Sequence, residues 1–449
     1  MKVFRPFLGI IVSLSVLFSA AAGQRPLNPS KRAAVPPQYQ IFDLGVVLTG
    51  DSASQGFGVS PGGIAVGRSF RTNATQAFSW TFGPGIAGLP NLGGRSYCVA
   101  NAANDAGTVV GTGATTAFGS GRLPVVWQNG VVSQLPLPVG ETLGDANDVN
   151  ASGVAVGSVN SGTLQRGAIY SGATATVITQ TSSGGSFFTT AFGINDAGRI
   201  VGIGIDPSNA ARNVGLVYDI ASGSAVDIGA LAGLNGAIAF GIGNGGHVVG
   251  SSMLNQGSGT PFIWTQAGGM TAIPLPAGTT QGSARAVNSS GWAVGTASSA
   301  FAIPFLYDGV STYRIADLIP AGTGWDLSTN TSSSALGISD NGIIVGTGVI
   351  NGLTHAYAMI PVTEVALSGR VLTAAGQGIR NSLVTVSGGD LGSPITVQTG
   401  SFGNFVVRGL HSAQTYTVTV NSKRFTFSQP SRQVSPLGNV TDIDFTAAP

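Results

Sequence analysis

The sequence predicts an all-β protein, a seven-bladed β-propeller closed by an N-terminal strand and followed by a small seven-stranded β-sandwich. Three observations carry this prediction. One five-residue motif occurs seven times, further β-rich segments follow each copy, and the two ends of the array are incomplete in complementary ways. A repeat of roughly 40–45 residues with four strands is typical of a propeller blade.

The motif is Gly-x-[Ile/Val/Ala]-Val-Gly, and its closing glycines are 44 to 51 residues apart. Asn or Ser stands three residues before the first glycine in six of the seven copies, and Gly243 in the other. Asn and Ser favour tight turns by bonding to nearby backbone, and glycine allows a positive φ. Each copy therefore predicts a β-hairpin. The copies are Gly63–Gly67, Gly107–Gly111, Gly153–Gly157, Gly198–Gly202, Gly246–Gly250, Gly291–Gly295 and Gly342–Gly346.

A third and a weaker fourth strand follow each hairpin. The third ends in Trp or Tyr in six of seven copies. One aromatic side chain at one fixed place per blade is better explained as filler between blades than as a platform for stacking sugars. The third-strand segments are "AFSW" 77–80, "PVVW" 124–127, "GAIY" 167–170, "GLVY" 215–218, "PFIW" 261–264, "PFLY" 304–307 and "AYAM" 356–359; fourth strands are "AVDIGAL" 225–231, "MTAIPLP" 270–276 and "YRIADLI" 313–319.

The two ends of the array complete each other. The seventh copy stops after its third strand, and a stray segment, Tyr39–Val47, precedes the first copy. Its "DLG", residues 43–45, resembles "DIG", residues 227–229, in a fourth strand. We therefore expect Tyr39–Val47 to be the outer strand of the last blade, with Phe42 close to Tyr357.

Other β architectures fit the repeat less well. A parallel β-helix has a period nearer 20–29 residues. Strands that cross an outer membrane need about 9–11 residues, roughly twice the length of these segments. Two stacked sandwiches would not repeat so evenly.

The first 23 residues resemble a secretory signal peptide. Lys2 and Arg5 precede an apolar run from Phe7 to Phe18, and small residues follow up to Gly23, as signal peptidase requires. A membrane anchor is the alternative, but the run is shorter than the roughly 20 residues that span a bilayer. We expect residues 1–23 to be removed, residues 24–38 to be a linker, and the mature protein to be secreted or at the cell surface without a membrane span.

Composition excludes a nucleic-acid partner. Charged residues make up 8% of the chain, the formal net charge is +2, and the mature part has no run of Lys or Arg. Nucleic-acid binding needs clustered cations. Cys98 is the only cysteine, so no intrachain disulfide can form, and we expect a small buried apolar residue.

The chain carries no motif for catalysis, a cofactor or a metal. The three histidines, His247, His355 and His411, lack metal-ligand spacing. No Gly-x-Ser-x-Gly elbow occurs in its expected setting, and local Gly-x-Gly pieces lack the strand–loop–helix context of a nucleotide site. We expect a protein that is not an enzyme, and we assign no catalytic, cofactor or metal residue.

Paired carboxylates on one propeller face would be the exception, because glycoside hydrolysis needs two such groups close together. Asp105 and Asp196 lie in repeat turns, and we interpret them as turn residues. The remaining candidates fall in or near loops. They are Glu141, Asp145, Asp148, Asp206, Asp219 and Asp326.

The repeats resemble the HAF repeat of extracellular bacterial proteins, which has an "IN-x-x-G-x-V-V-G" turn, then "HAF-x-W", then "DLG". "GINDAGRIVG", residues 193–202, matches the turn. "HAY", 355–357, and "QAFSW", 76–80, match the second part, and "DLG", 43–45, the third. The resemblance covers residues 39–362 and implies an extracellular repeat protein. The family assigns no reaction and no catalytic residues.

A different β-rich segment, residues 363–449, follows the repeats. Alternation as in Tyr416-Val418-Val420 is typical of half-buried strands, and about seven strands in eighty-odd residues predict a small β-sandwich. One of the expected strands is "RFTFS", 424–428. "GQGIRNSLVTV", 376–386, and "TGSFGNFVVRGL", 399–410, resemble the carboxypeptidase regulatory-like domain. That resemblance implies a transthyretin-like sandwich whose fold group is classed as carbohydrate-binding-like.

Together these features predict a secreted or cell-surface bacterial binding protein without catalytic activity. We expect the propeller to bind through loops on one face or at the mouth of its channel, and the sandwich to act as a spacer or adhesive module. An extracellular glycan and a surface protein are the candidate partners. One alternative is a polysaccharide-active extracellular enzyme, a hydrolase or lyase, that uses carboxylates on one propeller face; another is a purely structural surface protein with no small ligand.

Overall fold

The computed structural model describes residues 36–117, 119–162 and 164–449. The predicted signal peptide, 1–23, and most of the predicted linker, 24–38, lie outside the described residues. No helix within the described ranges has the length and hydropathy needed to cross a bilayer.

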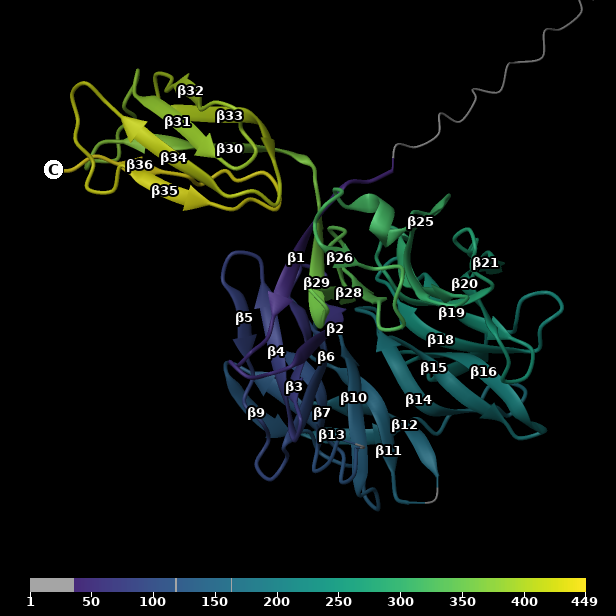
Figure 1. Ribbon diagram of the computed structural model, residues 1–449. Helices are drawn as coiled ribbons and strands as arrows, with labels where there is room; N and C mark the ends of the chain where they lie inside the picture. The colour runs from purple at the N-terminus through teal and green to yellow at the C-terminus, as the bar shows by residue number, and fades with distance from the viewer. Residues whose placement is uncertain (1–35, 118, 163) are drawn as a thin grey trace, which may run out of the picture. The chain divides into compact units, whose positions relative to one another are not determined.

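Residues 39–361 form seven antiparallel blades, one for each copy of the motif (Figure 1). Blade 1 contains β2–β5, blade 2 β6–β9, blade 3 β10–β13, blade 4 β14–β17, blade 5 β18–β21 and blade 6 β22–β25. Blade 7 contains β27, β28, β29 and β1. Blades 1 and 2 are also joined by one parallel pairing, Thr75 of β4 with Tyr97 of β6. The all-β propeller prediction is confirmed.

Blades 1 to 6 place their strands in chain order from the channel outward, and blade 7 does so for its first three strands, with β1 outermost. The first strands are β2 (Ala53–Val59), β6 (Tyr97–Ala103), β10 (Leu143–Val149), β14 (Phe187–Ile194), β18 (Gly236–Ile242), β22 (Gln281–Val287) and β27 (Ser334–Ile338). The second are β3 (Ala65–Arg71), β7 (Val109–Ala114), β11 (Ala155–Asn160), β15 (Arg199–Asp206), β19 (Val248–Met253), β23 (Ala293–Ser298) and β28 (Ile344–Ile350).

The third strands are β4 (Ala74–Thr81), β8 (Leu123–Gln128), β12 (Gln165–Ser171), β16 (Asn209–Asp219), β20 (Gly259–Thr265), β24 (Ala302–Tyr307) and β29 (Leu353–Pro361). The outer strands are β5 (Gly85–Gly88), β9 (Val131–Gln134), β13 (Thr174–Val177), β17 (Ser224–Asp227), β21 (Gly269–Ala272), β25 (Thr312–Arg314) and β1 (Tyr39–Gly45). Short β26 (Trp325–Asp326) adds a further pairing to β28.

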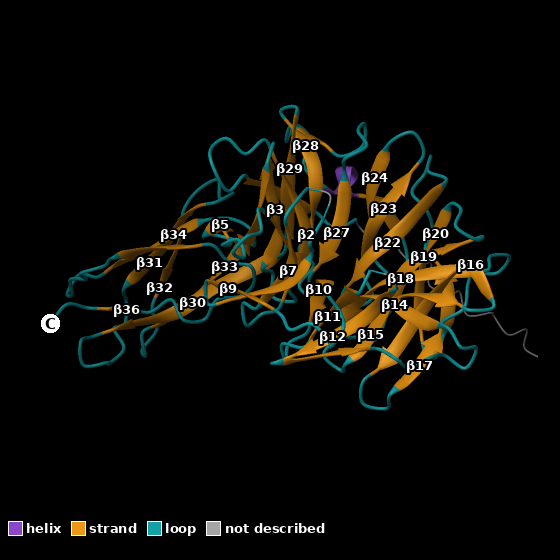
Figure 2. Ribbon diagram, turned by 90° about the horizontal axis from the view of Figure 1, so that it is seen from below, coloured by secondary structure: helices purple, strands orange, loops and turns teal. Residues whose placement is uncertain are grey.

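The first strands form a closed ring. Each contacts the first strand of the next blade, and β27 of blade 7 contacts β2 of blade 1. Figure 2 shows these strands gathered around a common centre. The ring therefore encloses a central channel, which the first strands line.

Strand β1 closes the ring as the sequence predicts. It pairs antiparallel with β29, with Phe42 opposite Ala358 and Asp43 opposite Tyr357. Tyr39 and Leu44 are buried at 1% and 3% exposure. His355 on β29 lies 2.9 Å from both carboxylate oxygens of Asp43. Two segments some 310 residues apart in the sequence thus form one blade.

The predicted hairpin turns are confirmed in all seven blades. The first glycine of each motif has a positive φ, between 76° at Gly198 and 109° at Gly63. The Asn or Ser three residues earlier accepts a backbone N–H through its side chain, as in Arg199 N–H to Asn195 Oδ1 at 3.0 Å. The third-strand aromatics mostly pack inside: Trp80, Trp127, Tyr170 and Tyr218 are buried, and Trp264 and Tyr307 are half-buried.

All three predicted outer strands end earlier than expected, β17 at Asp227 and β21 at Ala272, and the third also changes type. In "YRIADLI" the strand ends at Arg314, and a 3-10 helix follows over Ile315–Leu318. Side chains three residues apart share one face of a 3-10 helix, and Ile315 and Leu318 are both fully buried. Burial of this pair favours the helical turn over continued pairing.

The C-terminal segment forms two sheets around a core of its own. One contains β33 (Asn404–His411), β30 (Glu364–Leu372) and β36 (Phe445–Thr446); the other contains β32 (Ile395–Gln398), β31 (Leu383–Gly388), β34 (Tyr416–Asn421) and β35 (Ser431–Val434). The strand expected at 424–428 is wrong. Phe425 is exposed there, and the next strand is β35 instead, because β35 and not 424–428 pairs with the edge of β34.

Candidate functional site

Every first strand has a β-bulge at the same place. In β14 the pairing with β15 shifts between Ala191 and Gly193, so Phe192 has no ladder partner. The equivalent shift occurs in each of the other six blades. A bulge bends the strand and re-aims the side chain of the extra residue.

The closing glycine of the motif is required by this bulge. A Cβ atom on it would lie 1.9 to 2.1 Å from a backbone carbonyl oxygen of the first strand in all seven blades, for example Gly202 against Thr190. No side chain fits at that distance. The sequence predicts this glycine as part of a hairpin but not its role at the bulge, although its presence in every copy is a signal of that role.

The residue after the bulge is small for a related reason. It is Gly or Ala in six blades and Asp148 in the other. A Cβ on Gly58 would lie 2.4 Å from the Asn101 carbonyl oxygen, and one on Gly241 would lie 2.7 Å from that of Arg285. The first strands of neighbouring blades therefore approach each other closely at the bulge.

The seven bulge residues line a cavity of about 640 Å³ in the channel. Their backbone geometry repeats from blade to blade, but their side chains differ in chemistry. They are Phe57, Asn101, Asn147, Phe192, Phe240, Arg285 and Leu336. The sequence predicts binding through loops on one face or at the channel mouth and points to none of these residues, because a bulge leaves no mark on the alternation of side chains.

Two of the phenylalanines and the arginine of this set lie in contact with one another. The rings of Phe192 and Phe240 are 5.5 Å apart, and the Arg285 guanidinium lies 4.0 Å from the centre of the Phe240 ring. Arg285 is nevertheless solvent-exposed. On the other side, the amides of Asn101 and Asn147 donate to backbone carbonyls of the next blade, at 2.8 and 2.9 Å.

The hairpin turns surround one mouth of the cavity and join the blades. The turn Asn donates its side-chain N–H to the equivalent backbone carbonyl of the next blade: Asn104 to Asn150 at 3.0 Å, Asn150 to Asn195 at 3.3 Å and Asn288 to Ser339 at 3.3 Å. Each of these side chains thus accepts a hydrogen bond within its own turn and donates another to the neighbouring blade. The sequence predicts only the bond within the turn.

Four carboxylates line the cavity, and each accepts a backbone N–H from a neighbouring blade. The pairs are Gly62 to Asp105, Ile194 to Asp148, Ala151 to Asp196 and Ser289 to Asp340, at 2.7 to 2.9 Å. The interpretation of Asp105 and Asp196 as turn residues agrees with these contacts. These acids hold the mouth together.

Asp148 is the one predicted candidate that lines the cavity. Burial raises its pKa to about 7, and the nearby Asp196 carboxylate adds to the rise, against hydrogen bonds from the N–H groups of Ile194 and Val149. Its pKa in the unfolded chain is near the ordinary value of 3.8. Between these two pH values the folded protein holds a proton that the unfolded chain has lost.

Folding stability should therefore fall as pH rises from about 4 to 7, by at most ~1.4 kcal/mol per pH unit from this group. We expect Asp148→Asn to unfold at a higher temperature than the natural protein at pH 8, with a smaller difference at pH 4. Thermal unfolding at both pH values checks this. Asp105→Asn is the matched control, since Asp105 is an exposed acceptor of the same kind. An equal gain in both variants would contradict the assignment.

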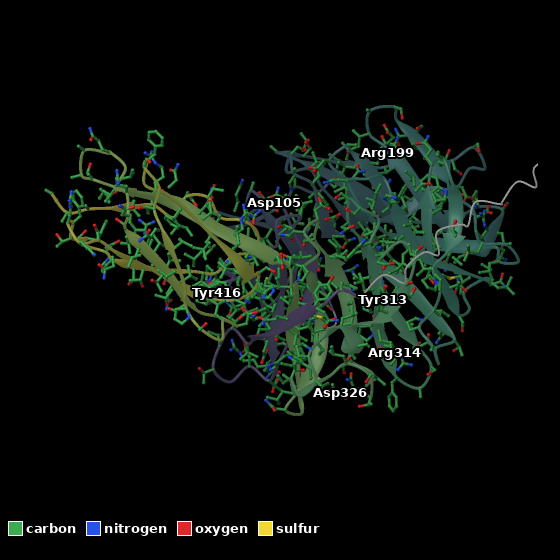
Figure 3. All side chains as sticks on the ribbon, turned by 90° about the horizontal axis from the view of Figure 1, so that it is seen from above. Asp105, Arg199, Tyr313, Arg314, Asp326 and Tyr416 are labelled. Atoms are coloured by element: carbon green, nitrogen blue, oxygen red, sulfur yellow. The ribbon has the colours of Figure 1, made fainter. Side chains whose placement is uncertain are left out.

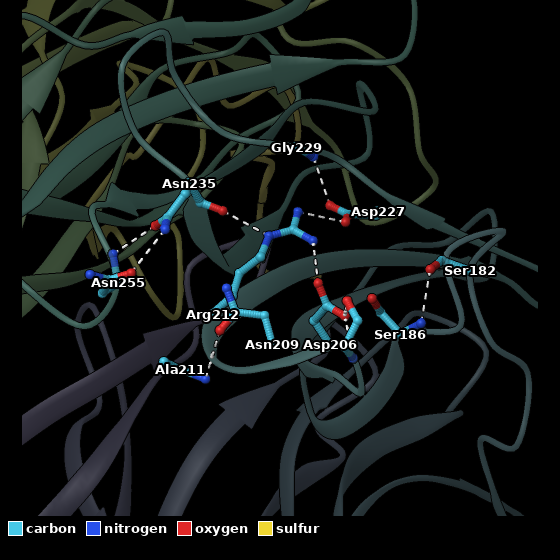
Figure 4. Close-up of polar contacts among 11 residues, drawn as sticks. Ser182, Ser186, Asp206, Asn209, Ala211, Arg212, Asp227, Gly229, Asn235 and Asn255 are labelled. Carbon is cyan, nitrogen blue, oxygen red and sulfur yellow. Dashed lines mark hydrogen bonds and ion pairs between the residues drawn. The ribbon is translucent and has the colours of Figure 1, made fainter.

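The other five candidate acids have their own partners away from this cavity. Glu141 pairs with Arg166, Asp145 with Arg122 at 3.1 Å, and Asp219 with Arg199 at 3.4 Å. Asp206 lies 3.1 Å from Arg212, which also reaches Asp227 at 2.7 Å (Figure 4). Three of these ion pairs join neighbouring strands of blade 4, and the other two join a strand to a loop.

Asp326 organises its own loop. Burial alone would raise its pKa, but hydrogen bonds from the N–H groups of Ser328 and Thr329 and from the Thr329 hydroxyl lower it to about 2. Asp326 lies far from Asp105 at the channel mouth (Figure 3). The structure therefore holds Asp326 apart from the carboxylates that line the channel cavity.

The histidines do not form a cluster with other metal-ligand residues in the described part of the chain. His355 pairs with Asp43, and His411 lies 2.6 Å from Asp390. Within residues 36–449, apart from 118 and 163, no three His, Cys, Asp or Glu side chains are grouped to hold a metal. Cys98 is buried as expected, and burial raises the pKa of its thiol.

Comparison with known proteins identifies the C-terminal domain. Residues 366–448 match the carboxypeptidase regulatory-like domain. A comparison with curated protein sequences gave no match. The chain combines a β-propeller with this C-terminal domain.

Solved structures similar to the chain include several β-propellers at low identity. Virginiamycin B lyase from Staphylococcus aureus is 11% identical, over 72% of this chain and 99% of that chain, with a TM-score of 0.42. YCF48 bound to D1 peptide is 10% identical, over 72% and 97%, with a TM-score of 0.39. The β-propeller domain of the Trilobed protease from Pyrococcus furiosus is 11% identical, over 68% and 90%, with a TM-score of 0.34. The similarity concerns the fold, and no function is carried over from it.

Proposed function

We propose that the chain is a secreted or cell-surface binding protein of the HAF-repeat type that recognises a glycan in the channel cavity and does not act on it chemically. The observation that carries the proposal is the ring of seven bulge residues. The fold holds them at one position in every blade, but leaves their side chains free to vary, so their identities set the chemistry of the cavity. The sandwich would serve as a spacer or second binding module.

The chemistry of the cavity suits a sugar. Phe57, Phe192 and Phe240 supply aromatic faces, which are large binding surfaces with little conformational freedom to lose. Arg285 supplies hydrogen-bond donors beside them. A volume of about 640 Å³ lies in the range of small-ligand pockets, which are about 300–1,000 Å³.

The rival function, a polysaccharide hydrolase or lyase, needs carboxylates free to transfer protons or attack the sugar. Within the described part of the cavity lining, all four carboxylates bind backbone N–H groups of a neighbouring blade. This arrangement favours binding without catalysis.

A glycan array probed with the purified mature protein, beside hydrolysis assays on the same glycans, tests the proposal. We expect binding of at least one glycan and no cleavage. Phe240→Ala should weaken that binding about tenfold, since an aromatic contact of this kind contributes ~1.4 kcal/mol, with little change in melting temperature. Phe402→Ala, at an exposed position in the sandwich, is the control and should bind normally. Binding to no glycan, or cleavage, would overturn the proposal.

A further inference from the structure

A second cavity, of about 670 Å³, lies between blades 1 and 2. Its lining residues Arg71 and Thr72 are exposed and lie at the turn between β3 and β4, at the end of these strands opposite to the hairpin turns of the channel mouth. Its wall contains three arginines, Arg68, Arg71 and Arg122, and no acidic residue among the described residues that line it. This is a concentration of charge in a chain with only 8% charged residues.

Arg68 has a fixed orientation and no carboxylate partner among the described residues. Its Nε and Nη2 donate to Gln55 Oε1 at 2.9 and 2.7 Å. Its guanidinium lies 5.4 Å from the ring centres of both Phe57 and Phe70. A guanidinium held in this way loses little freedom on binding an anion, and its remaining N–H donors suit a two-oxygen group.

The other two arginines are held by acids that lie outside the cavity wall. Arg71 Nη1 lies 2.9 Å from Asp51, whose side chain is 2% exposed, and Arg122 Nη1 lies 3.1 Å from Asp145, whose side chain is 12% exposed. The two arginine side chains remain 42% and 36% exposed. Each ion pair uses one nitrogen, which leaves other donors for a ligand.

The local charge and the neighbouring groups define the ligand. Three arginines against two aspartates leave one net positive charge, which suits a monoanion better than a phosphate dianion. Thr75, Tyr97 and Thr112 add hydroxyl groups to the wall. We propose that this cavity binds the carboxylate of an acidic sugar, such as a uronic acid unit of a glycan, with Arg68 as the principal contact. The inference rests on the proposed function in taking a glycan as ligand, but it concerns a separate site.

Isothermal titration of the mature protein with trimers of galacturonate, glucuronate and mannuronate, and with the neutral galactose, glucose and mannose trimers, tests the site. We expect at least one acidic trimer to bind at least tenfold more tightly than its neutral counterpart. Arg68→Gln should weaken that binding on the order of 10- to 100-fold, as expected for loss of a hydrogen bond to a charged group. Arg68→Met, which keeps an apolar chain between the two phenylalanine rings, should do the same if Arg68→Gln folds poorly.

Two matched variants distinguish binding at this cavity from binding in the channel and from general charge attraction. Arg285→Gln changes the channel cavity and should leave binding of the acidic trimer unchanged. Arg199→Gln removes the same charge from blade 4 and should also have no effect. If Arg199→Gln weakened binding of the acidic trimer as much as Arg68→Gln does, the binding would be general electrostatic attraction and the proposed site would be wrong. Equal affinity for the acidic and neutral trimers would also contradict it. If only Arg285→Gln weakened binding of the acidic trimer, the acidic sugar would bind in the channel. The inference about the second cavity would then fail, but the proposed function would still hold.

Discussion

Removal of β1 should destabilise the whole propeller. The loss takes away the buried side chains of Tyr39 and Leu44 and the backbone pairing with β29. Loss of large buried side chains costs roughly 2–5 kcal/mol each, so we expect about 5 kcal/mol or more, and a melting temperature lower by about 10 °C or more. The newly exposed edge of β29 should also promote self-association, because an unpaired edge strand is a template for another chain.

The comparison is between a chain that begins at Leu48 and one that begins at Pro36, followed by calorimetry and light scattering. The second chain retains β1 and should melt like the mature protein. A synthetic peptide of residues 37–48, added in excess to the shorter chain, should restore part of the lost stability by pairing with β29. Equal melting of the two chains would refute closure of the ring by this strand.

Gly202→Ala should have the next largest effect. The new methyl group would lie 2.0 Å from the Thr190 carbonyl oxygen, and because that atom belongs to the backbone of the bulge, neither side can move without breaking strand pairing. Overpacking of this kind costs about 1–3 kcal/mol and occasionally more, and we expect a loss at the upper end of that range. Chemical denaturation measures it.

Gly93→Ala is the matched control for this substitution. Gly93 is exposed, its φ is not in the left-handed region, and a Cβ there meets nothing within 4 Å. The change should be neutral or stabilise by up to about 1 kcal/mol through the unfolded state. If the two alanine variants were equally stable, the closing glycine would not be a requirement of the bulge.

The sequence predicts those features of the fold that depend on contacts between neighbouring residues. The turn glycines needed only their own neighbours, and all seven positive φ values were predictable from spacing and residue type. The 3-10 turn at Ile315–Leu318 and the displaced strand β35 were not. In both cases burial and pairing with distant segments outweighed local alternation.

The candidate site also divides into a part that the sequence predicts and a part that depends on distant contacts. The fold class suggests two places for it, the loops of one face and the mouth of the channel. Its residues could not be predicted, because a bulge adds one residue to the pairing and leaves no mark on the alternation of apolar side chains. Residue type alone marks the loop acids as candidates, and the structure pairs Asp145, Asp206 and Asp219 with nearby arginines.

The sequence by itself determined the number of blades, the hairpin in each, and the strand that closes the circle, since these depend on repetition along one chain. Tertiary structure alone decided which side chains face the channel, which carboxylates join neighbouring blades, and where Arg68, Arg71 and Arg122 line one cavity. The physical reason is that these contacts join residues more than 40 positions apart, as between Asn104 and Asn150. Their geometry exists only once the blades are set side by side.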